Sequence, residues 1–99
     1  MDFHKEFKEM LDAWGEDAQI NICIEEMAEL TMALCKYLRH KRFGGVDPDK
    51  AAKNLENIRE EIADTLNCVT QMQYIFGERE VDDIRVAKVK RTMEKLKKI

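Results

Sequence analysis

The chain has 99 residues, which predicts one small domain over residues 1–99. Hydrophobic residues make up 44% of it and charged residues 37%, and a single proline with four glycines favours long helices over a turn-rich β protein. A net charge of −3 argues against nucleic-acid polymers as partners, and the sequence shows neither a membrane-spanning apolar run nor a signal-peptide core. We therefore expect a cytoplasmic protein whose three cysteines are reduced core residues.

Apolar residues recur at steps of three and four along most of the chain, which predicts four helices and no strand. In chain order these helices cover residues 2–14, about 17–42, about 48–76 and a last segment from about 81. Gly15 and Gly77 end the first and third helices, and Phe43-Gly44-Gly45 interrupts the chain between the second and third. The expected fold is all-α, a four-helix bundle whose two long middle helices run antiparallel.

Each of the two long helices carries a continuous apolar stripe. The stripe comprises Ile20, Cys23, Met27, Leu30, Leu34 and Tyr37 on one helix, and Leu55, Ile58, Ile62, Leu66, Val69, Met72 and Phe76 on the other. Stripes of this width exceed what a lone antiparallel pair covers. The pattern therefore predicts a homodimer or a homotetramer.

Acidic residues interrupt both stripes, as Glu25-Glu26-Met27-Ala28-Glu29 on one helix and Glu61-Ile62-Ala63-Asp64 on the other. Residues three apart share one side of a helix, so each motif projects two carboxylates in nearly one direction. With a rise of about 1.5 Å per residue, the two motifs lie at similar distances from the connection between the helices and are expected to meet. Four such carboxylates repel one another, and a divalent cation relieves the repulsion. Oxygen ligands without histidine or thiolate predict Mg²⁺, with Mn²⁺ as a substitute.

Acidic helix patterns also have an ordinary explanation, because Glu-Glu-x-x-Glu is common on solvated helix faces. The second, opposed motif is what favours a metal site over that explanation. A ferritin-like di-iron site does not fit, because it needs Glu-x-x-His on two helices and neither His4 nor His40 follows a glutamate by three residues.

The two motifs resemble the signature of the all-α nucleoside triphosphate pyrophosphohydrolases, the MazG-like group with its dimeric dUTPase and dCTPase relatives and the related phosphoribosyl-ATP pyrophosphatase. That signature is Glu-Glu-x-x-Glu followed, after a spacer, by Glu-x-x-Asp, as at residues 25–29 and 61–64. The resemblance implies a MazG-like bundle in which Glu26, Glu29, Glu61 and Asp64 bind Mg²⁺ in catalysis. It also implies that Glu25 supports the ligands or orients the attacking water.

Substrate contacts follow from the same resemblance. It implies that Lys88 and Arg91 of the last helix hold phosphates, against the alternative of a solvated basic face. Residue chemistry, and not the resemblance, indicates which aromatic or amide side chains could hold the base, although each is more often a packing residue. Asn67 is the preferred candidate, and the others are Trp14, Asn21 and Tyr37. The implied reaction is Mg²⁺-dependent hydrolysis of a nucleoside triphosphate, standard, deoxy or modified, to the monophosphate and pyrophosphate. Two alternatives stay open: a nucleotide-binding protein without turnover, and a helical interaction protein whose acids are surface charge.

Overall fold

The computed structural model describes residues 2–43 and 47–99 and consists of four helices. They are α1 (His4–Trp14), α2 (Glu16–Phe43), α3 (Pro48–Phe76) and α4 (Glu78–Lys97). The described ranges contain no strand, which confirms the all-α expectation, and α4 begins three residues earlier than its apolar pattern indicates. The expected break at Gly44 and Gly45 lies outside those ranges. No helix in the described parts of the chain is long and apolar enough to cross a bilayer.

Helix boundaries have clear local causes. Gly15 lies between α1 and α2 with φ +89°, and Gly77 lies between α3 and α4 with φ +117°. Glycine adopts positive φ without the Cβ clash that other residues meet, so each glycine ends one helix and lets the chain turn into the next. α3 begins at Pro48, where a missing N–H costs nothing, and the side chain of Asp47 accepts a hydrogen bond from the Lys50 N–H at 3.0 Å.

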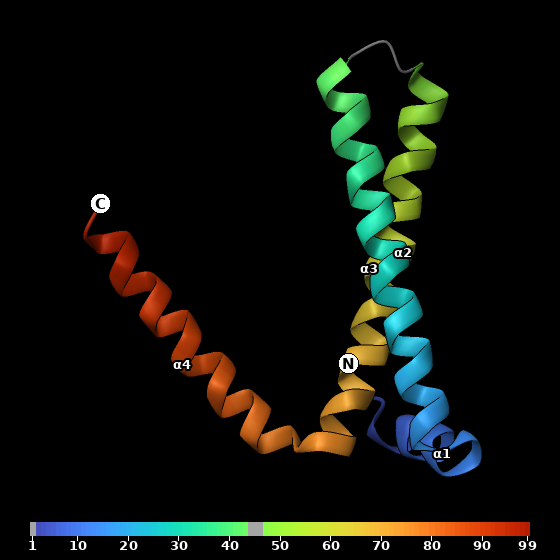
Figure 1. Cartoon of the computed structure of the whole chain (residues 1–99), viewed down its shortest axis with the longest axis vertical. Helices are drawn as coiled ribbons and strands as arrows, with labels where there is room; N and C mark the ends of the chain where they lie inside the picture. Colours follow the sequence, from blue (N-terminus) through green and yellow to red (C-terminus); the bar gives the residue numbers. More distant parts are fainter. Residues whose placement is uncertain (1, 44–46) are drawn as a thin grey trace.

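The long helices α2 and α3 lie side by side and antiparallel (Figure 1). Where they meet, small and polar side chains predominate. The contact face, as we call this set, consists of Gln19, Cys23, Glu26, Leu30, Ala33 and His40 on α2 and of Asn54, Ile58, Glu61, Thr65, Cys68 and Met72 on α3. The Thr65 hydroxyl donates to the Glu26 carbonyl oxygen at 3.4 Å, and the side chains of Asn54 and His40 are hydrogen-bonded. The two helices are therefore joined by hydrogen bonds as well as by apolar packing.

α1 packs against the end of this pair where α2 begins and α3 ends (Figure 1). Phe7 is buried there, with its ring 6.1 Å from that of Tyr74, and the side chain of Gln71 donates to the sulfur of Met10 at 3.3 Å. The buried apolar residues of the described chain are Phe7, Cys23, Ala33, Ile58 and Cys68. The core is thus small.

Most of the expected apolar stripe is exposed. The exposed members are Met27, Leu34 and Tyr37 on α2 and Leu55, Ile62, Leu66, Val69 and Phe76 on α3. Cys35 is exposed as well, so the expectation of three core cysteines is wrong for this residue. It follows buried Ala33 by two positions, about 200° around the helix, and so points away from α3.

α4 leaves the body at Gly77 and packs mainly against α3 near the junction (Figure 1), where its first residue, Glu78, also lies 4.0 Å from His4 of α1. There the Gln73 side-chain amide donates to the Asp82 carboxylate at 2.9 Å. The chain measures 46 × 43 × 23 Å and has a radius of gyration of 17.2 Å, against about 13 Å for a compact domain of this length. A single chain is therefore a helix pair with two attached helices.

Candidate metal centre

The acidic motifs meet midway along the α2–α3 pair. Glu26 and Glu61 belong to the contact face and are half-buried. Each follows a buried residue by three positions, Glu26 after Cys23 and Glu61 after Ile58. Because residues three apart share one side of a helix, burial of these neighbours turns both glutamates toward the facing helix.

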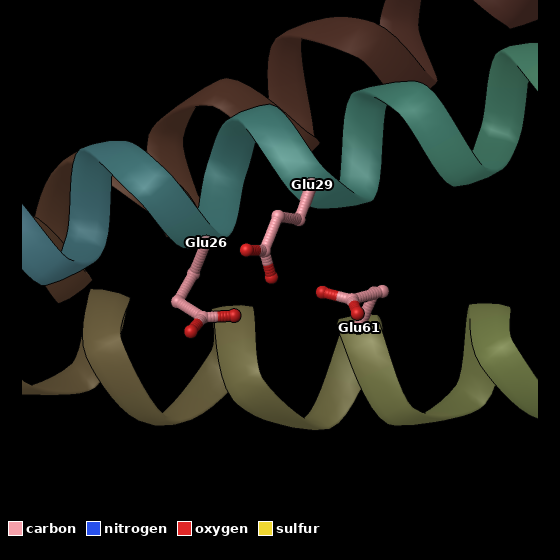
Figure 2. Close-up of side chains that lie close together, drawn as sticks. All are labelled: Glu26, Glu29 and Glu61. Atoms are coloured by element: carbon pink, nitrogen blue, oxygen red, sulfur yellow. The ribbon is translucent and has the colours of Figure 1, made fainter.

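Three carboxylates converge between the helices. Oxygen atoms of Glu26, Glu29 and Glu61 all lie within 4.8 Å of one another. Figure 2 shows Glu26 and Glu29 reaching from α2 toward Glu61 on α3. The structure thus brings together three of the four acids that the sequence pattern indicates as metal ligands.

Burial and mutual repulsion raise the pKa of two of these acids. For Glu26 burial is the largest cause, followed by the charges of Asp64, Glu29 and Glu61. Burial also contributes most to the raised pKa of Glu61, followed by the charge of Glu29 and a hydrogen bond with it. In both residues the Oε2 atom is covered and has no hydrogen-bond partner among the described residues. Covered carboxylate oxygens are costly unless a cation or proton reaches them.

Asp64 and Glu25 stand outside this group of three. The negative charge of the Asp64 carboxylate contributes to the raised pKa of Glu26, although Asp64 itself is exposed. Glu25 is exposed and does not join the converging oxygens of the described chain. Asp64, Glu25 and Glu29 each precede a member of the contact face by one residue. This position turns all three toward one side of the helix pair, which we call the acidic side.

Comparison with known proteins assigns no family to this chain. The chain matches no family model, no curated protein and no solved structure. The resemblance of its motifs to the MazG-like group therefore stays a prediction.

The donor set fits a small divalent cation. It consists of carboxylates alone, and the converging group within residues 2–43 and 47–99 includes no histidine or thiolate. Hard oxygen donors suit Mg²⁺ or Mn²⁺, and Mg²⁺ commonly keeps water and substrate phosphates as its other ligands. The unpartnered Oε2 atoms of Glu26 and Glu61 are where a cation would replace the missing hydrogen bonds.

A groove of about 730 Å³ begins within one helical turn of Asp64. It lies between the start of α1 and the outer side of α3, and Asn67, three residues after Asp64, lines it. Its other lining residues include Phe3, Phe7, Leu66, Thr70 and Tyr74. Sequence reasoning missed Tyr74 as a lining residue, although it follows Asn67 by seven positions and so shares its side of α3.

The remaining candidates for substrate contact lie away from this groove. Trp14, Asn21 and Tyr37 do not line it, and all three are exposed. Lys88 and Arg91 are exposed on α4, beyond the junction where that helix contacts α3. Within one chain neither of these two cations reaches the acidic residues.

Proposed function

We propose that this protein is a Mg²⁺-dependent nucleoside triphosphate pyrophosphohydrolase of the MazG-like type that works as a homo-oligomer. The observation that carries the proposal is the convergence of three carboxylates from two opposed helices, two of them with a covered oxygen that lacks a partner. Solvated helix acids would instead turn apart and keep their hydration. The all-α architecture and the paired motifs support the same assignment.

The acids of this chain provide the geometry of the reaction. Glu26, Glu29 and Glu61 would hold the ion, and Asp64 would supply a fourth carboxylate near Glu26. A bound Mg²⁺ would supply positive charge that polarises the α-phosphate and lowers the pKa of an attacking water. Glu25, on the open acidic side, orients that water or accepts its proton. Attack at the α-phosphate then releases pyrophosphate and leaves the monophosphate.

The groove beside Asp64 supports a nucleotide as the substrate. Asn67 offers both a donor and an acceptor to the edge of a base, and the rings of Phe3, which is exposed, and Tyr74 offer apolar faces for packing. Lys88 and Arg91 stay our candidates for phosphate contact. The proposed substrate is a nucleoside triphosphate, and a deoxy or modified one belongs in any test panel.

Release of pyrophosphate from a panel of standard, deoxy and modified nucleotides with Mg²⁺ tests this proposal. Glu61→Gln should lower the rate by about 100-fold or more, because it removes a ligand charge. Glu56→Gln is the matched control, since it makes the same change at an exposed position of the same helix. Its rate should equal that of the wild type.

Mn²⁺ binding followed by electron paramagnetic resonance separates the alternatives. Binding without release from any nucleotide would identify a protein without turnover. If Mn²⁺ does not bind, or binds Glu61→Gln as tightly as the wild type, the metal site is refuted.

A further inference from the structure

Cations gather at the end of the α2–α3 pair that lies away from α1 (Figure 1). Residues 36–53, which include this end, carry six basic side chains and two acidic ones. The remaining parts of the two helices, residues 16–35 and 54–76, carry one basic side chain and nine acidic ones. The charge of the pair therefore changes sign beyond the carboxylates of the candidate metal centre.

Two of these cations lie on the same helix faces as the acids. Lys36 follows Glu29 by seven residues, and Lys53 precedes Asp64 by eleven. Seven residues stop about 20° short of two full turns, and eleven go about 20° beyond three. Glu29 and Asp64 lie on the acidic side, so Lys36 and Lys53, both exposed, lie on that side as well.

These two lysines also lie at nearly the same level of the helix pair. The Thr65 hydroxyl donates to the Glu26 carbonyl oxygen, which fixes the residues that stand opposite each other. Ten residues beyond Glu26, Lys36 is level with Leu55, which precedes Thr65 by ten. Leu55 and Lys53 are two residues apart, a rise of about 3 Å. The two cations therefore form one positive patch across both helices.

Helix stability does not explain all of these cations. Lys50 is the third residue of α3, where the positive end of the helix dipole disfavours a cation and favours an acid such as its neighbour Asp49. Lys50 also precedes Glu61 by eleven residues, so it continues the line of that acid along α3. None of the three lysines forms an ion pair with a carboxylate of the described residues. They are therefore available to an anion from outside the chain.

The groove beside Asp64 extends in the opposite direction, toward α1. Asn67 and Tyr74 line it, three and ten residues beyond Asp64. The carboxylate cluster thus lies between an amide and an aromatic ring on one side and the cations on the other. A nucleoside triphosphate has the same order of groups, because its α-phosphate lies between the nucleoside and the charged tail.

We propose that Lys36, Lys50 and Lys53 bind the β- and γ-phosphates of the substrate, so that the nucleotide lies along the α2–α3 pair with its base toward α1. This inference rests on the proposed function, in which the metal at the acids holds the α-phosphate. Lys36 lies about 10.5 Å beyond Glu29 along the helix. The phosphate chain and the lysine side chain together span this gap.

The lysine site differs from the candidates on α4. Within one chain Lys88 and Arg91 do not reach the acidic residues, whereas Lys36 and Lys53 belong to the helices that carry them. Lysine presents a compact positive charge that binds phosphate oxygens. Positive charge at this position would also offset the negative charge that grows on pyrophosphate as it leaves.

Calorimetric titration of inorganic tripolyphosphate into the full chain with Mg²⁺ tests this site without turnover. Lys36→Gln, Lys50→Gln and Lys53→Gln should each raise the Kd for tripolyphosphate by about tenfold, because each removes a charge-assisted contact. Asn67→Ala should not raise this Kd, since tripolyphosphate has no base. Mn²⁺ binding, followed by electron paramagnetic resonance, should be the same in the lysine variants as in the wild type.

Two matched variants serve as controls. Lys41→Gln and Arg59→Gln each remove one positive charge from an exposed position of the same two helices. Each of these residues follows a member of the contact face by one position, so it lies on the side opposite the acids. The Kd for tripolyphosphate in both controls should stay within about twofold of the wild type. Circular dichroism establishes that every variant is helical.

Two results would overturn this inference while leaving the metal site intact. One is a wild type that binds Mn²⁺ but not tripolyphosphate. The other is a Kd that the lysine variants raise no more than the controls do, or that Asn67→Ala raises in their place, because the phosphates would then lie in the groove.

Failure of the proposed function gives different results. A chain that does not bind Mn²⁺ refutes the metal site and this inference with it. A chain that binds tripolyphosphate through the three lysines but releases pyrophosphate from no nucleotide refutes turnover alone.

Discussion

Removal of the Ile58 side chain measures how strongly the small contact face holds the acidic motifs together. Ile58 is 8% exposed and lies one turn before Glu61. Ile58→Ala removes three carbon groups worth about 0.8 kcal/mol each, and the cavity left behind brings the expected loss of stability to about 3 kcal/mol. For a domain of this size, the melting temperature should fall by about 12–24 °C.

Thermal and urea unfolding followed by circular dichroism at one fixed chain concentration measure this loss. Ile84→Ala makes the same chemical change at a side chain that is 55% exposed, and it should cost less than about 1 kcal/mol. Because Ile58 supports Glu61, Ile58→Ala should also weaken Mn²⁺ binding, whereas Ile84→Ala should not. Equal losses of stability in the two variants would refute the assignment of Ile58 to the core.

Three further predictions concern charge, backbone and phosphate contact. Burial raises the pKa of Glu26 and Glu61, so the folded metal-free chain binds protons more tightly than the unfolded chain does. The free energy of unfolding, measured in the presence of a chelator, should therefore rise as the pH falls toward these raised pKa values. It should rise less in Glu26→Gln. Gly77→Ala should cost about 1–3 kcal/mol in urea unfolding, because φ is +117° and the added Cβ meets the Glu80 carboxylate; an unchanged midpoint would contradict this. Arg91→Ala should raise the KM for the triphosphate by about tenfold, as loss of a charge-assisted hydrogen bond does, and an unchanged KM would remove Arg91 from the site.

The helices and the acidic pairs were predictable from sequence because their causes are local. Gly15 and Gly77 end helices through a backbone conformation that glycine adopts readily. Because Glu26 and Glu29 are three residues apart in α2, their side chains point to the same side of that helix regardless of the rest of the fold. Convergence with Glu61 then needed only two antiparallel helices of similar length.

The buried side of each long helix was not predictable in the same way. Cys23 and Met27 belong to one apolar stripe by spacing, yet the first is buried against α3 and the second is exposed. Two overlapping stripes satisfy the same three- and four-residue steps, and only the position of the neighbouring helix decides between them. Gln19, which is 2% exposed, shows the same dependence, because composition alone places glutamine at the surface.

The direction in which α4 extends is a second property that the spacing of apolar residues does not predict. The pattern around Lys88 and Arg91 predicts a helix with one basic side, and the structure confirms the helix. The direction of α4 depends on the backbone conformation of Gly77 and on the side-chain hydrogen bond between Gln73 and Asp82, which lie on either side of that turn. Contact between these cations and a substrate therefore stays a prediction.

A one-residue offset separates the two flanks of the contact face: residues that precede it by one position form the acidic side, and Leu34 and Val69, which follow it by one position, are exposed and apolar. A substitution at Leu34 or Val69 changes this apolar surface without touching a carboxylate, and a substitution at Glu29 or Asp64 changes the charge of the acidic side without touching the apolar surface. Insertion of a single residue within α2 has the opposite effect, because it rotates everything beyond it by about 100° and so moves the acidic flank into the contact with α3 and the contact face out to the other flank. Point mutation can therefore change the apolar surface and the charge of the site independently in this chain, while a one-residue insertion in α2 disrupts both together.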